Sequence, residues 1–447
     1  MKTTSCLLLS AALLAAVSLL PAGDTPRPAA PAPSPGAGSY AAHEWGTFTS
    51  VQAADGIQMT WNPLSVADLP KFVYDGVPVV NGKRLARGYL GKALATRQRM
   101  ETPVIYFYSD REQSVDVAVD FPQGTITEWF PRLGPGDRSN TNQLMADRSR
   151  IRWPQVKLHP LAAHPALGSQ LPTDPSGSHY YAARETAADF LEVNGTGPDG
   201  RPVTEIEKFL FYRGVGGFTA PLTVTQSGED AETLSLSNTG PDELRHLFVY
   251  TVRGNQAKFG FLPELAPKAG RTITGAAAGV LGPLSEVRAQ VARELADALV
   301  SEGLFPDEAM AMVKTWDDSW LAEPGTRVLY VLPRAWTDRV LPLRLSPPPK
   351  DLVRVMVGRA ELITPRMEWN LTKQLVRYLE GDDAGRPKVV EATRGLGLGR
   401  FLEPTARRVQ ARVGTEEMNA GVAGLMRDLA GASKPPGAED KLARLFQ

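Results

Sequence analysis

Cysteine is almost absent from this 447-residue sequence, which contains only Cys6. Cys6 lies in an N-terminal segment that we expect to be removed, so the mature chain would have no disulfide bonds and no thiol nucleophile. A lipid anchor would need its cysteine at the end of an apolar run, whereas Cys6 lies near the beginning of one. The sequence therefore indicates neither a disulfide-stabilised fold nor a lipoprotein.

An excess of charge of either sign is also lacking, because 49 Lys and Arg residues balance 49 Asp and Glu residues. Such a chain creates no global field that would attract nucleic acid or an anionic membrane surface. We therefore expect no nucleic-acid partner. The hydrophobic content of 43% is nonetheless sufficient for packed cores, so the chain is expected to be globular.

Long hydrophobic runs are limited to the one from Leu7 to Leu20. Lys2 precedes this run and the small residues of Pro21-Ala22-Gly23 follow it, which is the pattern of a signal peptide over residues 1–23. We expect export to the periplasm or the exterior of a bacterium. No other run reaches the roughly 18–20 apolar residues of a bilayer span, so none would remain after cleavage. Without cleavage, the run would stay as a short N-terminal anchor.

Bulky apolar side chains are missing from residues 24–39, which read DTPRPAAPAPSPGAGS. This segment cannot bury enough apolar surface to offset the entropy lost on ordering. We expect a disordered linker.

Residues 40–275 contain short runs rich in β-branched and aromatic residues, separated by Gly, Pro, Asn and Asp. In the run 115–121 the odd positions are apolar, so one face packs and the other meets water. We expect an antiparallel β-sandwich-like domain. The predicted strands are Gly46–Val51, Val104–Tyr108, Val115–Phe121, Thr125–Phe130, Lys208–Tyr212, Leu222–Gln226, Thr233–Ser237, Leu247–Val252 and Ala257–Leu262.

Residues 276–430 change to helical periodicity, which makes the fold class α+β. Apolar residues recur at three- and four-residue steps from Leu284 to Leu299, and Gly303 follows. Two strand-like runs are expected at Arg327–Leu332 and Leu352–Ile363, within a mainly helical domain. Further helices are predicted from Pro306 to before Pro324 and over Pro365–Leu379, Pro404–Arg412 and Glu416–Leu429. Residues 431–447 are expected to be a flexible tail.

The segment between residues 132 and 178 is poor in order signals. Proline recurs in it too often for a helix or a central strand. Long ordered loops are frequently functional, so we expect this segment to form the rim of a site.

The first candidate for chemistry is His43-Glu44-Trp45, where a histidine beside a carboxylate could move a proton and the indole could stack on a sugar. Glu-Trp recurs at residues 128–129 and 368–369. A glycosidase needs two carboxyl groups, for which Glu44, Glu128 and Glu185 are candidates. The alternative is a core tryptophan beside a solvent-facing glutamate.

The run 178–186 is dense in polar-tipped aromatic residues and in opposite charges. His179, Tyr180, Tyr181 and Arg184 could recognise a ligand by stacking and bidentate contacts. Together with His43 and Trp45 they form the ligand-binding site that we predict. A buried Arg–Glu pair that only fixes the backbone is the alternative.

Metal and cofactor motifs are scarce, because the chain has only five histidines. The five-residue spacing of His159 and His164 fits neither a one-face helical pair nor a zinc-finger arm. We expect no metal site and no cofactor, although a dispersed site of His43 or His179 with Glu185 stays open. Nucleophile-elbow and SxxK signatures are also absent.

These features favour an exported protein that binds a small molecule, a glycan, a peptide or a partner protein outside the cytoplasm. A secreted, carboxylate-based glycoside hydrolase is the first alternative, and a structural component of the cell envelope is the second. The sequence does not decide whether the protein is an enzyme.

Overall fold

The computed structural model describes residues 40–431, except for 62–68, 77–78, 81–82, 85–95, 135, 140–148, 176, 198–199 and 383. The signal peptide and linker predicted for residues 1–39 lie outside the described residues, as does the tail from residue 432. The described chain has a β-rich N-terminal region followed by helices and a few further strands. The predicted α+β fold, with a sandwich-like first part and a mainly helical second part, is confirmed.

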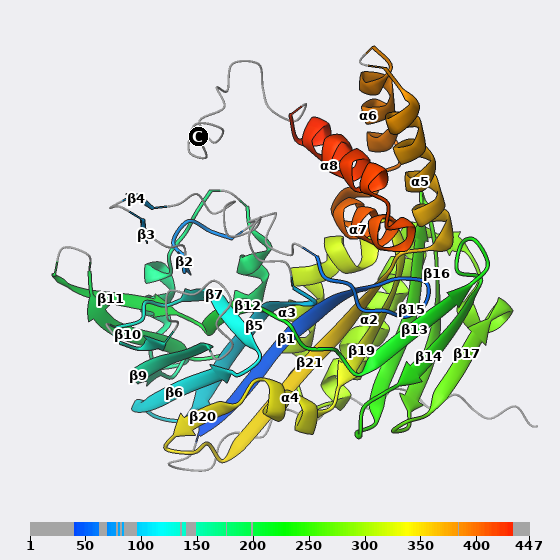
Figure 1. The fold of residues 1–447 in the computed structure, drawn as a ribbon. Helices are drawn as coiled ribbons and strands as arrows, with labels where there is room; N and C mark the ends of the chain where they lie inside the picture. Colours follow the sequence, from blue (N-terminus) through cyan, green and yellow to red (C-terminus); the bar gives the residue numbers. More distant parts are fainter. Residues whose placement is uncertain are drawn as a thin grey trace, which may run out of the picture. The chain divides into compact units, whose positions relative to one another are not determined.

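The largest sheet has ten strands (Figure 1). Its first strand in the chain, β1, is parallel to β21 on one side and antiparallel to β5 on the other. In spatial order the strands are β18 (Gly282–Pro283), β16 (Gln256–Leu265), β15 (Leu244–Arg253), β19 (Gly325–Leu332), β21 (Asp351–Leu362), β1 (Tyr40–Gln52), β5 (Gln98–Ser109), β12 (Leu210–Gly216), β7 (Gly124–Phe130) and β2 (Tyr74–Asp75).

This sheet continues across the position where the sequence changes from β to α character. Strands β19 and β21 follow residue 275, yet they lie directly beside β15 and β1. The division into domains at residues 275 and 276 stays a prediction.

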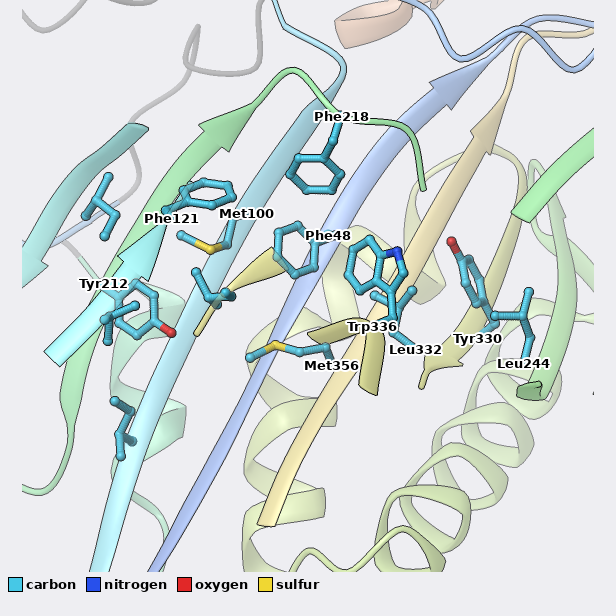
Figure 2. Close-up of a cluster of buried hydrophobic side chains, with 14 of the residues drawn as sticks. Phe48, Met100, Phe121, Tyr212, Phe218, Leu244, Tyr330, Leu332, Trp336 and Met356 are labelled. Atoms are coloured by element: carbon cyan, nitrogen blue, oxygen red, sulfur yellow. The ribbon is translucent and has the colours of Figure 1, made fainter. Parts of the chain in front are cut away.

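Two smaller sheets pack against one face of the large sheet, through a shared core. Figure 2 shows part of this core, in which Phe48, Met100 and Met356 of the large sheet lie near Phe121 of β6 and Trp336. The six-stranded sheet has the order β11 (Pro202–Glu207), β10 (Phe190–Thr196), β9 (Ser149–His159), β6 (Gln113–Phe121), β20 (Leu343–Ser346), with β8 (Arg138–Ser139) beside β9. The three-stranded sheet has the order β13 (Leu222–Ser227), β14 (Thr233–Asn238), β17 (Gly270–Thr274), and a separate pair consists of β3 (Val79–Val80) and β4 (Lys83–Arg84). The predicted alternation in residues 115–121 is confirmed, since the odd positions of β6 are buried.

Strand β9 corrects the prediction that residues 132–178 hold no central strand, because it lies between β10 and β6. Its Pro154 is tolerated because a bulge interrupts the pairing with β6 at this point. Gln155 has a φ of 51° and donates its backbone N–H to the side chain of Asp116 at 2.8 Å. The missing N–H of the proline therefore costs the sheet no regular hydrogen bond.

The opposite face of the large sheet is covered by helices α2 (Leu284–Ser301) and α3 (Pro306–Asp317), which share a second core with it. In α2 the predicted apolar stripe is confirmed, because Val291, Leu295 and Leu299 are buried. A π-helical turn, Asp318–Ala322, follows α3. Coverage of both faces explains why every residue of β1 is buried.

Helices α5 (Pro365–Glu380), α6 (Arg386–Arg394), α7 (Leu402–Val413) and α8 (Glu416–Gly431) pack around a core of their own. The hydroxyl of Thr364 caps α5 by accepting the backbone N–H of Met367 at 3.2 Å. The short α4 (Arg334–Val340) lies between β19 and β20 in the chain. Among the described helices, none has both the length and the apolar character that a membrane crossing requires.

Candidate functional site

His43 and Trp45, two of the predicted ligand-binding residues, lie in the interior. His43 is 3% exposed and Trp45 is fully buried. Nδ1 of His43 is 2.8 Å from a carboxylate oxygen of Glu308, which also accepts the hydroxyl of Tyr108 and the backbone N–H of Phe305, each at 2.7 Å. These contacts use the acceptor capacity of Glu308 to fasten α3 to the sheet, so the arrangement is a structural one. Ligand binding by His43 and Trp45 stays a prediction.

Glu44 is also fully buried, so the alternative of a core tryptophan beside a solvent-facing glutamate is wrong for Glu44. The smaller sheets cover the face of β1 that would otherwise meet water. The carboxylate accepts Nε of Arg354 at 2.6 Å and the hydroxyl of Tyr212. Burial alone would lower the pKa of Arg354, but the carboxylate beside it raises that pKa instead. Burial, reinforced by Glu44, raises the pKa of Tyr212 far above its usual range.

The other two candidate catalytic carboxylates are likewise held by cations. Glu128 on β7 is buried and pairs with Arg213 at 2.7 Å. Burial alone would raise the pKa of Glu128, but the guanidinium outweighs burial and the pKa is lowered, which does not suit a general acid. Glu185 is exposed and pairs with Lys314. Of the dispersed metal site of His43 or His179 with Glu185, the structure shows His43 beside Glu308 and Glu185 beside Lys314, and the site stays a prediction.

The third Glu-Trp pair reverses the expected arrangement of a core tryptophan and a solvent-facing glutamate. Trp369 on α5 is 61% exposed, whereas Glu368 is buried and pairs with Arg412 at 2.8 Å. Trp369 lies beside a small hollow of about 330 Å³ that is also lined by Glu229, Arg366, Asn370 and Lys373.

The predicted cluster in residues 178–186 folds as the 3₁₀ helix η2 (His179–Arg184). Arg184 forms two hydrogen bonds, of 2.9 and 2.6 Å, to the carboxylate of Glu207, which also accepts the hydroxyl of Tyr180 at 3.0 Å. Glu207 is fully buried. The alternative of a buried Arg–Glu pair therefore describes these contacts, with Glu207 rather than Glu185 as the acid.

The remaining side chains of this cluster pack against neighbouring elements. The ring of His179 lies 5.0 Å from that of Trp316 on α3, and the guanidinium of Arg184 lies 5.0 Å from the ring centroid of Tyr181. The hydroxyl of Tyr181 accepts the backbone N–H of Asp174 at 2.6 Å. The structure brings His179, Tyr180, Tyr181 and Arg184 together, and ligand binding by them stays a prediction.

A larger hollow lies over the outer face of the six-stranded sheet, with a volume of about 670 Å³. We call it the β20 groove. Three neighbouring strands form it, through residues 116–118 of β6, 150 and 152–154 of β9 and 343–346 of β20, together with Pro348, Pro349 and Leu352. None of the predicted site residues lines this groove.

A row of three residues crosses the floor of the β20 groove. Ala118 pairs with Arg152 of β9 on one side and with Arg344 of β20 on the other, so these side chains project from the same face. Asp120, two positions along β6, forms ion pairs with Arg150 and with Arg344. The side chain of Arg152 is exposed and has no hydrogen bond or ion pair with any described residue. Among the described residues, the guanidinium of Arg152 therefore has no partner, and that of Arg344, on the other side of Ala118, has a carboxylate partner.

A histidine–carboxylate cluster, which sequence reasoning missed, lies where β9 ends. His164 Nε2 is 2.7 Å and His159 Nδ1 is 3.5 Å from the same carboxylate oxygen of Glu112. The two histidine rings are 5.0 Å apart. The chain reverses at Pro160, whose carbonyl accepts the backbone N–H of His164 at 3.1 Å. The five-residue spacing of His159 and His164 was compared with helical and zinc-finger patterns. The two residues instead lie at the end of a strand and in the turn that follows it. The prolines of this segment were the sequence signal for that turn.

Comparisons with known proteins provide little further information. No family model matches the chain, and no curated protein matches it. Among solved structures, the yeast delta-COP-I mu-homology domain aligns with 73% of this chain and 98% of its own, at 6% identity and a TM-score of 0.26. The same domain complexed with a Dsl1 WxWxV peptide aligns with 73% of this chain and 96% of its own, at 6% identity and a TM-score of 0.23. Likenesses at this level carry no argument about fold or function.

Proposed function

We propose that this protein is an exported binding protein that takes an acidic peptide segment, from a partner protein or free, into the β20 groove. Export rests on the signal-peptide pattern of residues 1–23. The observation that carries the binding proposal is the row of Arg152, Ala118 and Arg344, in which Arg152 has no partner among the described residues.

Arginine suits a carboxylate because its planar guanidinium can donate two parallel hydrogen bonds. Strands lie about 4.8 Å apart, so the Cβ atoms of Arg152 and Arg344 are separated by roughly 10 Å, and Ala118 leaves space between them. A carboxylate that lies over Ala118 is then within reach of both guanidinium groups. Each hydrogen bond to a charged group contributes about 1.5–3 kcal/mol, so two of them contribute about 3–6 kcal/mol, equivalent to dissociation constants between about 6 mM and about 40 μM.

The rest of the groove favours a peptide over a neutral sugar. Pro348 and Pro349 supply apolar surface beside the charges, as peptide grooves do. The aromatic residue that lines the groove, Trp153, has its side chain buried in the core, so it offers no stacking platform. The volume of about 670 Å³ accommodates a few side chains.

Binding of a short fluorescent peptide of alternating glutamate and alanine, followed by anisotropy, tests the proposal. We expect Arg152→Gln to weaken binding by about tenfold or more, equivalent to about 1.4 kcal/mol, and Arg344→Gln to weaken it less because Asp120 already compensates that charge. Replacing the glutamates of the peptide by glutamine should abolish binding.

The matched control is Arg271→Gln, which removes an exposed arginine from a strand of a different sheet, β17. This variant should bind as the unaltered chain does. Equal loss in Arg271→Gln and Arg152→Gln, or undiminished binding in Arg152→Gln, would contradict the proposal.

A second candidate function, glycan binding, is favoured by the exposed Trp369 in its hollow of polar side chains. An exposed indole framed by polar residues can stack on a sugar ring. Quenching of tryptophan fluorescence by soluble cell-wall oligosaccharides, compared with Trp369→Ala, distinguishes this site from the β20 groove. Quenching that persists in Trp369→Ala would eliminate it.

A further inference from the structure

The histidine–carboxylate cluster at the end of β9 has the composition and spacing of a metal site. The donor atoms of Glu112, His159 and His164 all lie within 4.8 Å of one another. Bonds of about 2.0–2.1 Å to a tetrahedral zinc ion place its ligand atoms roughly 3.3 Å apart. The distances of 2.7 and 3.5 Å from the oxygen of Glu112 to His164 and His159 bracket that value. Small side-chain rotations would therefore suffice to surround an ion.

The orientation of His159 is the second observation, and it points to a ligand. Its Nε2 lies 3.2 Å from Oε2 of Glu192. The other carboxylate oxygen, Oε1, accepts Lys157 Nζ at 2.6 Å and the side-chain amide of Asn194 at 2.9 Å. An imidazole that donates from Nε2 presents the lone pair of Nδ1 on its other side. That Nδ1 atom is buried and has no hydrogen bond with the described residues. Metal-binding histidines usually have one ring nitrogen held by a carboxylate in this way, while the other ring nitrogen faces the metal. Here Glu192 holds Nε2, and Nδ1 faces Glu112 and His164.

We propose that Glu112, His159 and His164 bind a divalent transition-metal ion of the zinc type, with Glu192 as the positioning residue of His159. Two imidazoles and one carboxylate suit zinc, and they leave one coordination position for water. Glu112 is 60% exposed, so an ion reaches the site from solvent. The ion would connect the residue that precedes β6, the end of β9 and the loop that follows β9.

The alternative is that the three side chains hold one another only by hydrogen bonds between imidazole and carboxylate. The two explanations differ in whether a metal titration saturates. They also differ in the expected effect of changing Glu192. Because Glu192 lies outside the cluster, its loss weakens metal binding only if Glu192 orients His159 as a metal ligand.

Calorimetric titration of Zn²⁺ into the full chain, purified without a histidine tag and stripped with a chelator, tests the proposal. We expect one ion per chain, and tetrahedral visible absorption when Co²⁺ replaces zinc. His164→Gln and Glu112→Gln should weaken binding by more than about 100-fold, and Glu192→Gln by about 10–100-fold, as outer-shell changes do. Glu112→Gln alters a mostly exposed side chain, so its folding is not in question.

The matched control is His246→Gln. His246 also lies 3.2 Å from a glutamate, Glu302, but has no second histidine beside it. This variant should bind zinc unchanged. Absence of saturable binding, or equal affinity in His164→Gln and His246→Gln, would overturn the proposal without bearing on the β20 groove, whose arginines are absent from the cluster.

Discussion

The buried ion pair of Glu44 and Arg354 provides a test of whether Glu44 stabilises the folded state. Replacing Glu44 by glutamine keeps its shape but removes the charge that faces the guanidinium at 2.6 Å. Breaking one side of a buried ion pair costs about 3–5 kcal/mol. Arg354 keeps its bonds of 2.7 Å to Asp338 and to the carbonyl of Leu341, so we expect a loss near the lower end, about 3 kcal/mol. Urea unfolding followed by circular dichroism measures this loss.

A second variant and a control separate this explanation from a catalytic role. The double change Glu44→Gln with Arg354→Met removes both charges and should recover much of the loss, because no unpaired buried charge remains. Glu185→Gln breaks an exposed pair with Lys314 and should cost less than about 1 kcal/mol. If the free energy of unfolding of Glu44→Gln lies within about 0.5 kcal/mol of that of the unaltered chain, the structural role is refuted, and Glu44 stays a candidate of the hydrolase alternative.

Three further predictions address the groove, the pH dependence of stability and the packing of the central sheet. Ala118→Glu places a carboxylate between the two arginines of the groove floor. This variant should therefore have a free energy of unfolding higher by about 0.5–1 kcal/mol and should no longer bind the acidic peptide. A loss of stability with retained binding would contradict the proposed geometry. Burial raises the pKa of Asp189 from 3.8 to about 6. The folded state therefore binds this proton more tightly than the unfolded state does. The free energy of unfolding, relative to that of Asp189→Asn and measured with a chelator present, should fall by up to about 3 kcal/mol as the pH rises from about 4 to about 7. A rise with pH would refute the assignment. In Gly358→Ala the new methyl carbon would lie 2.2 Å from the ring of Tyr330 in the neighbouring strand. We therefore expect the free energy of unfolding in urea to fall by about 1–3 kcal/mol. An unchanged value would show that the ring moves freely.

Local patterns in the sequence were sufficient to predict the fold class. Alternation in residues 115–121 and the three- and four-residue steps from Leu284 to Leu299 depend only on neighbours in the chain, so they survive as β6 and α2. The failure at β9 has a cause that is not local in the sequence, because Pro154 is accommodated by a bulge that depends on Asp116 of the adjacent strand. Such a pairing cannot be read from composition.

The candidate site was harder to predict because its partners are distant in the sequence. The alternative of a solvent-facing Glu44 holds only for a strand with one face in water, whereas Glu44 is buried beside Arg354, which lies 310 positions later. The partner of Arg184 is Glu207, not the neighbouring Glu185. The groove floor depends on the register of β9, β6 and β20, and no motif marks β20 as a strand. Residue types in the sequence suggested chemistry, but only the pairing decides which charges are neutralised.

The most direct test of the central claim is where an acidic peptide attaches. A photoreactive peptide of alternating glutamate and alanine, cross-linked to the full chain and mapped by mass spectrometry, should label residues 116–118, 150–154 and 343–349, and Arg152→Gln should diminish the labelling. Labelling concentrated at residues 179–184 or at Trp369, and unaffected by Arg152→Gln, would contradict the assignment of the β20 groove as the binding site.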